Sequence, residues 1–121
     1  MESKEAVAAL AALAHEGRLG VFRMLVKAGS EGVAAGEIAR RLGVPANSLS
    51  ANLSVLGHAG LIDSRRKGRS IIYTAGYDRM AALLAHLLKD CCQGSPAICA
   101  PLVGIMNRPA CCAPVPEART T

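Results

Sequence analysis

The first 60 residues of the chain show apolar positions at the spacing of amphipathic helices. The pattern predicts four helices, over residues 3–14, 18–29, 34–42 and 46–59. One face of the first helix collects Val7, Leu10, Ala11 and Ala14, and a stripe on the second collects Leu19, Phe22 and Val26. Gly29, Gly43 and Gly60 end the last three helices, because glycine is the commonest residue just after a helix C-terminus.

The period changes after Gly60. Residues 61–64 and 70–74 are short segments rich in Ile and Tyr, and a basic turn at Lys67-Gly68 joins them, which predicts a β-hairpin. Residues 78–92 return to helical spacing with a wide apolar stripe of Met80, Leu83, Leu84, Leu87 and Leu88. The order α-α-α-α-β-β-α is typical of a mainly α, winged helix-turn-helix fold, in which the third and fourth helices form the turn motif and the hairpin is the wing.

The length of 121 residues suits one domain with one core, which we place at residues 1–92. Five of the six prolines follow Gly94, so residues 93–121 are predicted to be a cysteine-containing loop and a flexible tail. No apolar run approaches the ~18 residues that cross a bilayer. The N-terminus lacks the basic, then apolar, regions of a signal peptide. We therefore expect a cytoplasmic protein without a membrane partner, whose thiols stay reduced.

Basic residues gather in the predicted wing, and the formal net charge is +5. The wing cations are Arg65, Arg66, Lys67 and Arg69. A basic loop beside a helix-turn-helix is a phosphate-contacting surface, although such a cluster can also be a solvated loop. In the fourth helix an inward stripe of Leu49, Leu53 and Leu56 turns outward the short side chains of Asn47, Ser48, Ser50, Ala51 and Ser54. These can reach base edges of duplex DNA, or simply be solvated.

Three stretches, "ALAHEGRLGVFRML", "GEIARRLGVPANSLSANLSVLGHAGLIDSRRKGRSIIYT" and "MAALLAHLL", resemble the ArsR/SmtB family of metal-responsive repressors across roughly residues 5–90. The resemblance implies a homodimer, paired through its first and last helices, that releases duplex operator DNA when a metal binds. It implies no small organic substrate. Some members carry a Cys-x-Cys-type site where this chain has Val33-Ala34-Ala35-Gly36. A zinc-sensing branch carries His where this chain has Met80, so neither of those sites is built here.

All the cysteines lie at the end of the last predicted helix or beyond it, and the first three are Cys91, Cys92 and Cys99. The chain looks like an arsenite-responsive branch of the family, with trivalent arsenic or antimony as inducer. Such an ion takes three thiolates in a pyramid, whereas structural zinc takes four ligands. Gly94 and Pro96 would let the chain turn back, so that Cys99 joins the adjacent pair. Cys111 and Cys112 could replace Cys99 or have no role.

Other functions use the same thiols. The chain could sense zinc or cadmium, or sense oxidants through thiol oxidation. A thiol enzyme of arsenic metabolism is disfavoured, because the negative end of a helix dipole opposes formation of a thiolate at Cys91 and Cys92. The sequence therefore predicts a transcriptional repressor of an arsenic-resistance operon, and not an enzyme.

Overall fold

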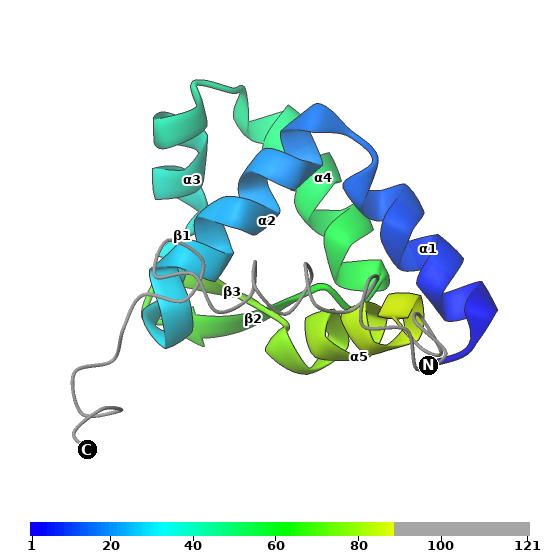
Figure 1. Ribbon diagram of the computed structural model, residues 1–121. Helices are drawn as coiled ribbons and strands as arrows, with labels where there is room; N and C mark the ends of the chain where they lie inside the picture. Colours follow the sequence, from blue (N-terminus) through cyan, green and yellow to red (C-terminus); the bar gives the residue numbers. More distant parts are fainter. Residues whose placement is uncertain (89–121) are drawn as a thin grey trace, which may run out of the picture. The chain divides into compact units, whose positions relative to one another are not determined.

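The computed structural model of the chain describes residues 1–88 (Figure 1). The predicted boundary between residues 92 and 93 lies outside the described residues, and so do Cys91, Cys92 and Cys99. Residues Met1–His86 form one compact unit. Among residues 1–88, no helix combines the length and the apolar character needed to cross a membrane.

The described part of the chain is mainly helical. Its helices are α1 (Ser3–Leu13), α2 (Glu16–Ala28), α3 (Ala35–Leu42), α4 (Ala46–His58) and α5 (Tyr77–Leu88, the last residue described). A short 3₁₀ turn, η1 (Gly29–Glu31), and three strands, β1 (Val33–Ala34), β2 (Ile62–Lys67) and β3 (Ser70–Ala75), complete it. The order of helices and hairpin is the predicted one. The winged helix-turn-helix fold is confirmed.

One strand of the sheet was not predicted. β1 pairs antiparallel with β3, with Val33 opposite Tyr73 and Ala34 opposite Ile72, which gives the strand order β1-β3-β2. A strand of two residues is too short to show the alternation that marks longer strands. Its effect is to fix the base of the wing to the segment that precedes α3.

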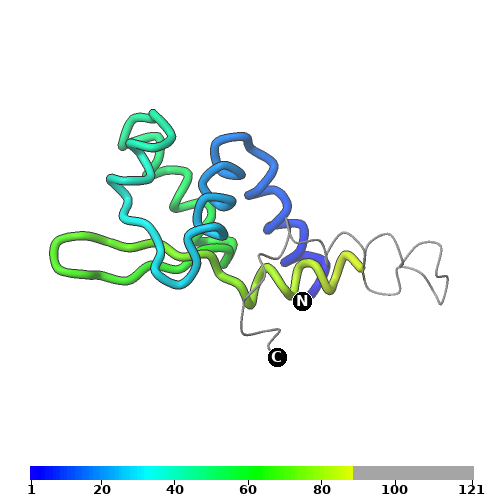
Figure 2. Tube along the Cα trace, turned by 60° about the vertical axis from the view of Figure 1, so that its left-hand side comes forward, coloured from blue at the N-terminus to red at the C-terminus, as the bar shows by residue number. Residues whose placement is uncertain are grey.

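The wing is longer than predicted and turns one residue later. Lys67 pairs with Ser70, so the two-residue loop is Gly68-Arg69 rather than Lys67-Gly68. Gly68 has φ +63°, as hairpin loops of this length require. The observed register places Arg66 opposite Ile71, whereas the predicted turn would have placed it opposite Arg69, and like charges directly opposite each other are destabilising. Figure 2 shows the hairpin extending away from the helices.

The core lies between α1, α2, α4 and the sheet. Its most deeply buried large side chains are Leu25, Ile38, Leu56, Leu61 and Val21. The α1 helix faces this core with Ala6, Ala9 and Ala12, whose small side chains allow close approach. The predicted stripe on α2 is only partly correct, because Leu19 is 43% exposed. Val21, Phe22 and Leu25 are the buried residues of that helix, so the buried face shares Phe22 with the predicted stripe and is turned away from Leu19.

The corner between α1 and α2 is held by two side chains. His15 caps α2, because its Nδ1 accepts hydrogen bonds from the backbone N–H groups of Gly17 (3.1 Å) and Arg18 (3.3 Å). The Arg18 side chain runs the other way, and its Nε donates to the carbonyl oxygen of Ala12 at 2.6 Å, near the end of α1. His15 and Arg18 therefore have structural roles at this corner.

Candidate nucleic-acid interface

The α4 helix presents a polar face to solvent. Its inward side chains are those of Leu49, Leu53 and Leu56, each at most 5% exposed. The residues predicted to face outward are all exposed: Asn47, Ser48, Ser50, Ala51 and Ser54. The outward placement is therefore confirmed, while contact of these residues with DNA stays a prediction.

Two side chains on this face are oriented by their own helix. The Oδ1 atom of Asn47 accepts a hydrogen bond from the backbone N–H of Ser48 (2.9 Å), which leaves the amide nitrogen of Asn47 as a donor for a base or phosphate. Three turns later, Nδ1 of His58 donates to the carbonyl oxygen of Ser54 at 2.8 Å. The exposed surface of α4 thus offers short, partly pre-oriented hydrogen-bonding groups.

The turn between α3 and α4 sets the angle at which α4 is presented. Gly43 ends α3 in the left-handed conformation (φ +65°), and the backbone N–H of Val44 donates to the carbonyl oxygen of Ala39 at 3.2 Å. Pro45 then stands as the N-cap of α4 with extended backbone. A left-handed glycine and a proline in three residues give a short, stiff connection, as a helix-turn-helix needs.

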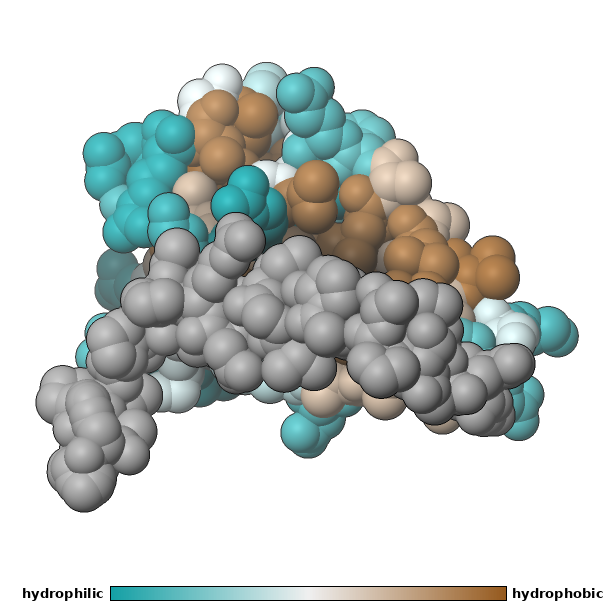
Figure 3. Space-filling model, viewed as in Figure 1, coloured by the Kyte–Doolittle hydropathy of each residue, from teal (hydrophilic) through white to brown (hydrophobic). Residues whose placement is uncertain are grey.

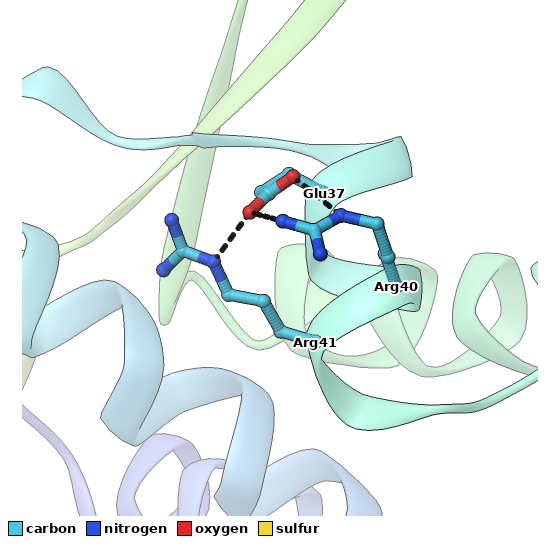
Figure 4. Close-up of polar contacts among 3 residues, drawn as sticks. All are labelled: Glu37, Arg40 and Arg41. Carbon is cyan, nitrogen blue, oxygen red and sulfur yellow. Dashed lines mark hydrogen bonds and ion pairs between the residues drawn. The ribbon is translucent and has the colours of Figure 1, made fainter.

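The exposed side of α3 carries a small charge network (Figure 4). Glu37 accepts hydrogen bonds from Arg40, on both carboxylate oxygens, and from Nε of Arg41 at 2.7 Å. The Arg40 hydrogen bonds, and then that of Arg41, hold the pKa of the Glu37 carboxyl below its usual value. Both arginine side chains are exposed to solvent, so the network adds little stability, and it leaves one net positive charge.

The four wing cations do not share one environment. The Arg65 guanidinium donates to the backbone carbonyl oxygens of Glu31 (3.0 Å) and Ser30 (3.5 Å), so it fastens β2 to η1. Because side chains alternate along a strand, Arg66 lies on the opposite face, together with Ser64 and its cross-strand partner Tyr73.

That opposite face is the one turned towards α4, since Ser64 and Tyr73 line a hollow with Ser54 of α4. Among the described residues, no ion pair involves Arg65, Arg66, Lys67 or Arg69. Within β2, Arg66 is thus the cation on the α4 side, whereas the Arg65 guanidinium contacts η1. Sequence reasoning grouped them because it had no signal for the contact with η1.

Comparisons with known proteins agree with this architecture. Residues 13–65, from the end of α1 into β2, match the family described as "Helix-turn-helix domain". The chain is 36% identical over 90 residues to the HTH-type transcriptional regulator YgaV of Escherichia coli K12, covering 74% of this chain and 89% of YgaV. It is 30% identical over 93 residues to the transcriptional activator HlyU of Vibrio cholerae, covering 77% and 83%.

Two solved structures are similar as well. Reduced HlyU from Vibrio cholerae superposes with a TM-score of 0.56 at 30% identity, covering 72% of this chain and 90% of HlyU. The homodimeric winged helix-turn-helix domain of Mb0332 from Mycobacterium bovis, a possible ArsR-family regulator, gives a TM-score of 0.59 at 28% identity, covering 72% and 80%. The chain belongs to the ArsR family of transcriptional regulators. As an ArsR-family regulator it binds DNA through its helix-turn-helix.

This ArsR-family chain leaves large apolar side chains uncovered on α1 and α5. Val7 is 64% exposed and Leu10 41%, on the face of α1 that points away from the alanine face, and Leu84 of α5 is 42% exposed. Figure 3 shows hydrophobic surface along α1. The two helices are linked by an ion pair between Arg79 Nη1 and Glu5 Oε2 at 3.5 Å.

The ion pair between α1 and α5 also affects the pKa of the Glu5 carboxyl. The backbone N–H of Glu2, and after it the Arg79 guanidinium, hold the pKa of the Glu5 carboxyl below its usual value. Glu5 also closes a capping box at the start of α1, where its Oε1 accepts the Glu2 N–H at 2.9 Å. The first turn of α5 is therefore anchored to a well-capped end of α1.

The predicted inducer ligands lie outside the described residues, so the site of Cys91, Cys92 and Cys99 stays a prediction. In the described part, Val33 and Ala34 form β1 and Ala35 begins α3, and none of these carries a donor for a metal. Asp78 is exposed in the first turn of α5, and Met80 is partly buried against the core.

Proposed function

We propose that this ArsR-family regulator is a homodimeric repressor of an arsenic-resistance operon. It leaves duplex operator DNA when trivalent arsenic or antimony binds Cys91, Cys92 and Cys99. The observation that carries the proposal is the distribution of thiols. All five cysteines follow α5, within residues 91–112, and residues 1–88 contain none. Three soft thiolates close together in sequence suit a thiophilic ion that takes a pyramid of three sulfurs.

The exposed apolar faces of α1 and α5 support the homodimer. Val7, Leu10 and Leu84 would lose contact with water in a two-fold interface, and burying a side chain of this size contributes about 1.5–3 kcal/mol. Mb0332, a structural neighbour, is described as homodimeric. A dimer also presents two α4 helices, which is how helix-turn-helix proteins bind two half-sites of an operator.

Release of DNA would follow from coupling between the two sites. An ion that binds three thiolates would fix the conformation of the chain directly after α5. This would strain the dimer interface that α5 helps to form. Because that interface sets the distance between the two α4 helices, their spacing would no longer match the operator. A coupling free energy of about 1–3 kcal/mol is typical, which corresponds to roughly 5- to 150-fold weaker DNA binding.

The test is DNA release, measured by fluorescence anisotropy of labelled operator under strictly reducing conditions. Arsenite, antimonite and methylated arsenic should raise the Kd for DNA, whereas zinc and cadmium should not. Each of Cys91→Ser, Cys92→Ser and Cys99→Ser should keep DNA binding and lose the arsenite response. Cys111→Ser and Cys112→Ser are matched controls that should still respond. If all five variants respond like the wild-type chain, the thiol-trap mechanism is wrong.

Oxidant sensing is the second candidate function. The observation that favours it is that the similar structure of HlyU is specifically of its reduced form, and this chain has two adjacent cysteine pairs, Cys91-Cys92 and Cys111-Cys112. The same assay separates the two functions. Peroxide alone would release DNA from an oxidant sensor, and a reductant would then restore binding, whereas arsenite under reductant would have no effect.

A further inference from the structure

A basic groove between α2 and α3 has no part in the functions described so far. Its volume is about 470 Å³. Three cations and three small or apolar residues line it: Arg23, Lys27, Arg41, Gly20, Met24 and Ala28. No carboxylate is among these lining residues. Figure 1 shows α3 beside α2, and Figure 3, seen from the same side, shows hydrophilic surface over α3.

The groove opens on the side of α2 that is turned away from α4. Val21 and Leu25 are buried in the core, to which α4 also contributes. At about 100° per residue, Arg23 lies about 200° round the helix from Val21. The same step separates Lys27 from Leu25. None of the lining residues belongs to α4 or to the wing, so a duplex bound to α4 and the wing leaves this groove unoccupied.

The two α2 cations of the groove are placed to meet an anion. Arg23 and Lys27 are both exposed. Among residues 1–88, neither of them forms an ion pair. They lie four residues apart on α2, where like charges are neighbours and destabilise a helix. The stability of α2 therefore does not account for this pair.

The third cation already binds a carboxylate. Nε of Arg41 donates to Oε2 of Glu37 within α3. Figure 4 shows the terminal nitrogens of Arg41 directed away from Glu37. A guanidinium has five N–H donors and can bind a carboxylate through two of them at once, so Arg41 keeps donors for a second carboxylate.

We propose that the groove between α2 and α3 binds an acidic segment of a partner protein. Carboxylates of the segment bond to the three cations of the groove. An apolar side chain of the segment packs on Met24, which is partly buried against the core. Leu19, one turn before Arg23, is 43% exposed and extends the apolar surface. The inference depends neither on the thiols nor on DNA binding.

A protein segment fits this surface better than a single small anion does. Cations exposed to solvent attract one anion weakly, because water and salt screen the interaction. Carboxylates carried by one chain bind together, because the first contact raises the effective concentration of the others. An apolar contact beside the charges adds burial that an inorganic anion cannot supply.

The probe is a fluorescein-labelled peptide of repeated Glu-Leu-Glu-Glu units, and its control is the same peptide with Gln in place of Glu. Binding to the full chain is measured by fluorescence anisotropy without DNA, at physiological salt and under reducing conditions. The groove variant replaces its three cations with glutamine: Arg23→Gln, Lys27→Gln and Arg41→Gln. The wing variant removes the same charge outside the groove: Arg66→Gln, Lys67→Gln and Arg69→Gln.

The wild-type chain should bind the acidic peptide and not the glutamine peptide. An exposed ion pair contributes a factor of about two to five, so the groove variant should bind the acidic peptide roughly tenfold more weakly. The wing variant should change the Kd by less than about twofold, because salt screens distant charges. Glu37→Gln should tighten binding by about twofold, since it releases Arg41 from the carboxylate of its own chain. Both triple variants replace exposed side chains, so their melting temperatures should match that of the wild-type chain.

Equal losses in the groove and wing variants would overturn the proposal, because the peptide would then respond only to net charge. A wild-type chain that binds neither peptide, or both peptides equally, would overturn it as well. Should the groove variant unfold, Glu37→Gln decides the question, and an unchanged affinity in that variant contradicts the proposal.

A last measurement separates a protein partner from DNA. The groove variant should keep the wild-type log-log salt slope on duplex DNA. A slope lower by ~0.9 for each removed cation would show that DNA occupies the groove, and the proposal would then be wrong.

Discussion

Replacing Gly32 with alanine should destabilise the protein, because it would push β3 of the wing away from the segment between η1 and β1. Gly32 lies between η1 and β1 with φ +72°, a conformation that residues with a Cβ rarely adopt. A Cβ atom there would stand 2.5 Å from the carbonyl oxygen of Tyr73, and 2.7 Å from the Cγ2 atoms of Ile72 and Thr74. Because that oxygen belongs to the backbone of β3, only a shift of the strand can relieve the collision.

Gly29 provides a matched control, because it has nearly the same φ (+71°) but a Cβ there would meet nothing within 4 Å. Gly29→Ala introduces backbone strain of about 1–3 kcal/mol. About 0.4–1 kcal/mol of that is offset by the more restricted unfolded chain. Gly32→Ala introduces the same strain and in addition a steric clash with β3, which costs about 1–3 kcal/mol. We therefore expect Gly32→Ala to be less stable than Gly29→Ala by about 1–3 kcal/mol.

The measurement is urea unfolding followed by circular dichroism, at one fixed protein concentration because a dimer's stability depends on it. With a denaturant slope of about 1–3 kcal/mol per molar urea, the midpoint of Gly32→Ala should lie roughly 1 M below that of Gly29→Ala. DNA binding should weaken in Gly32→Ala alone, since β3 carries the wing. Equal midpoints for the two variants would refute the close packing of β3 against Gly32.

Two further predictions concern the wing and the dimer. Arg66→Ala should weaken binding to all duplexes and lower the log-log salt slope by about 0.9. Arg65→Ala should weaken binding without changing the slope, because the Arg65 guanidinium contacts η1 rather than DNA. Equal salt slopes for the two variants would refute these different roles. Leu84→Glu should give monomers in sedimentation velocity, because a charge in an apolar interface is costly. Leu19→Glu, at an equally exposed leucine (43% against 42%), should stay dimeric, and a dimeric Leu84→Glu would place the interface elsewhere.

The parts of the fold with a long periodic pattern could be predicted from the sequence. All five helices begin within a few residues of their predicted bounds, and α1 to α4 also end there, because glycine, proline and the apolar stripes mark the ends. The apolar stripe on α1 was predicted correctly, but whether it faces the core or the outside could be learned only from the structure. Val7 and Leu10 point outward, and the core instead packs on the alanines of the opposite face. A sequence pattern identifies an apolar face without identifying what covers it.

The wing shows why the rest could not be predicted. The register of a hairpin depends on its loop, and a small shift changes every cross-strand pair. Arg65 and Arg66 read as loop residues because they are charged, yet both lie within β2, opposite Ile72 and Ile71. The contact from Arg65 to Glu31 joins residues 34 positions apart, which no local pattern encodes.

The junction between β3 and α5 connects the helix that precedes the proposed inducer segment directly to the wing. Gly76 alone separates the strand from the helix, and its N–H donates to the carbonyl oxygen of Leu61 at 2.7 Å, directly before β2. One residue later, the Tyr77 hydroxyl donates to the carbonyl oxygen of Val26 at the end of α2 (3.1 Å). A rotation of α5 must therefore carry β3 with it or break these contacts.

In the proposed mechanism the ion acts at the far end of this helix. Residues 77–88 span about 18 Å at 1.5 Å per residue, so a small displacement after Leu88 becomes a tilt at the Gly76 junction. The strain exists only while the ion holds the thiols together. A Cys→Ser variant would for this reason keep the DNA affinity of the ion-free protein and lose only its response to arsenite, which distinguishes coupling through α5 from a direct contribution of the thiols to DNA binding.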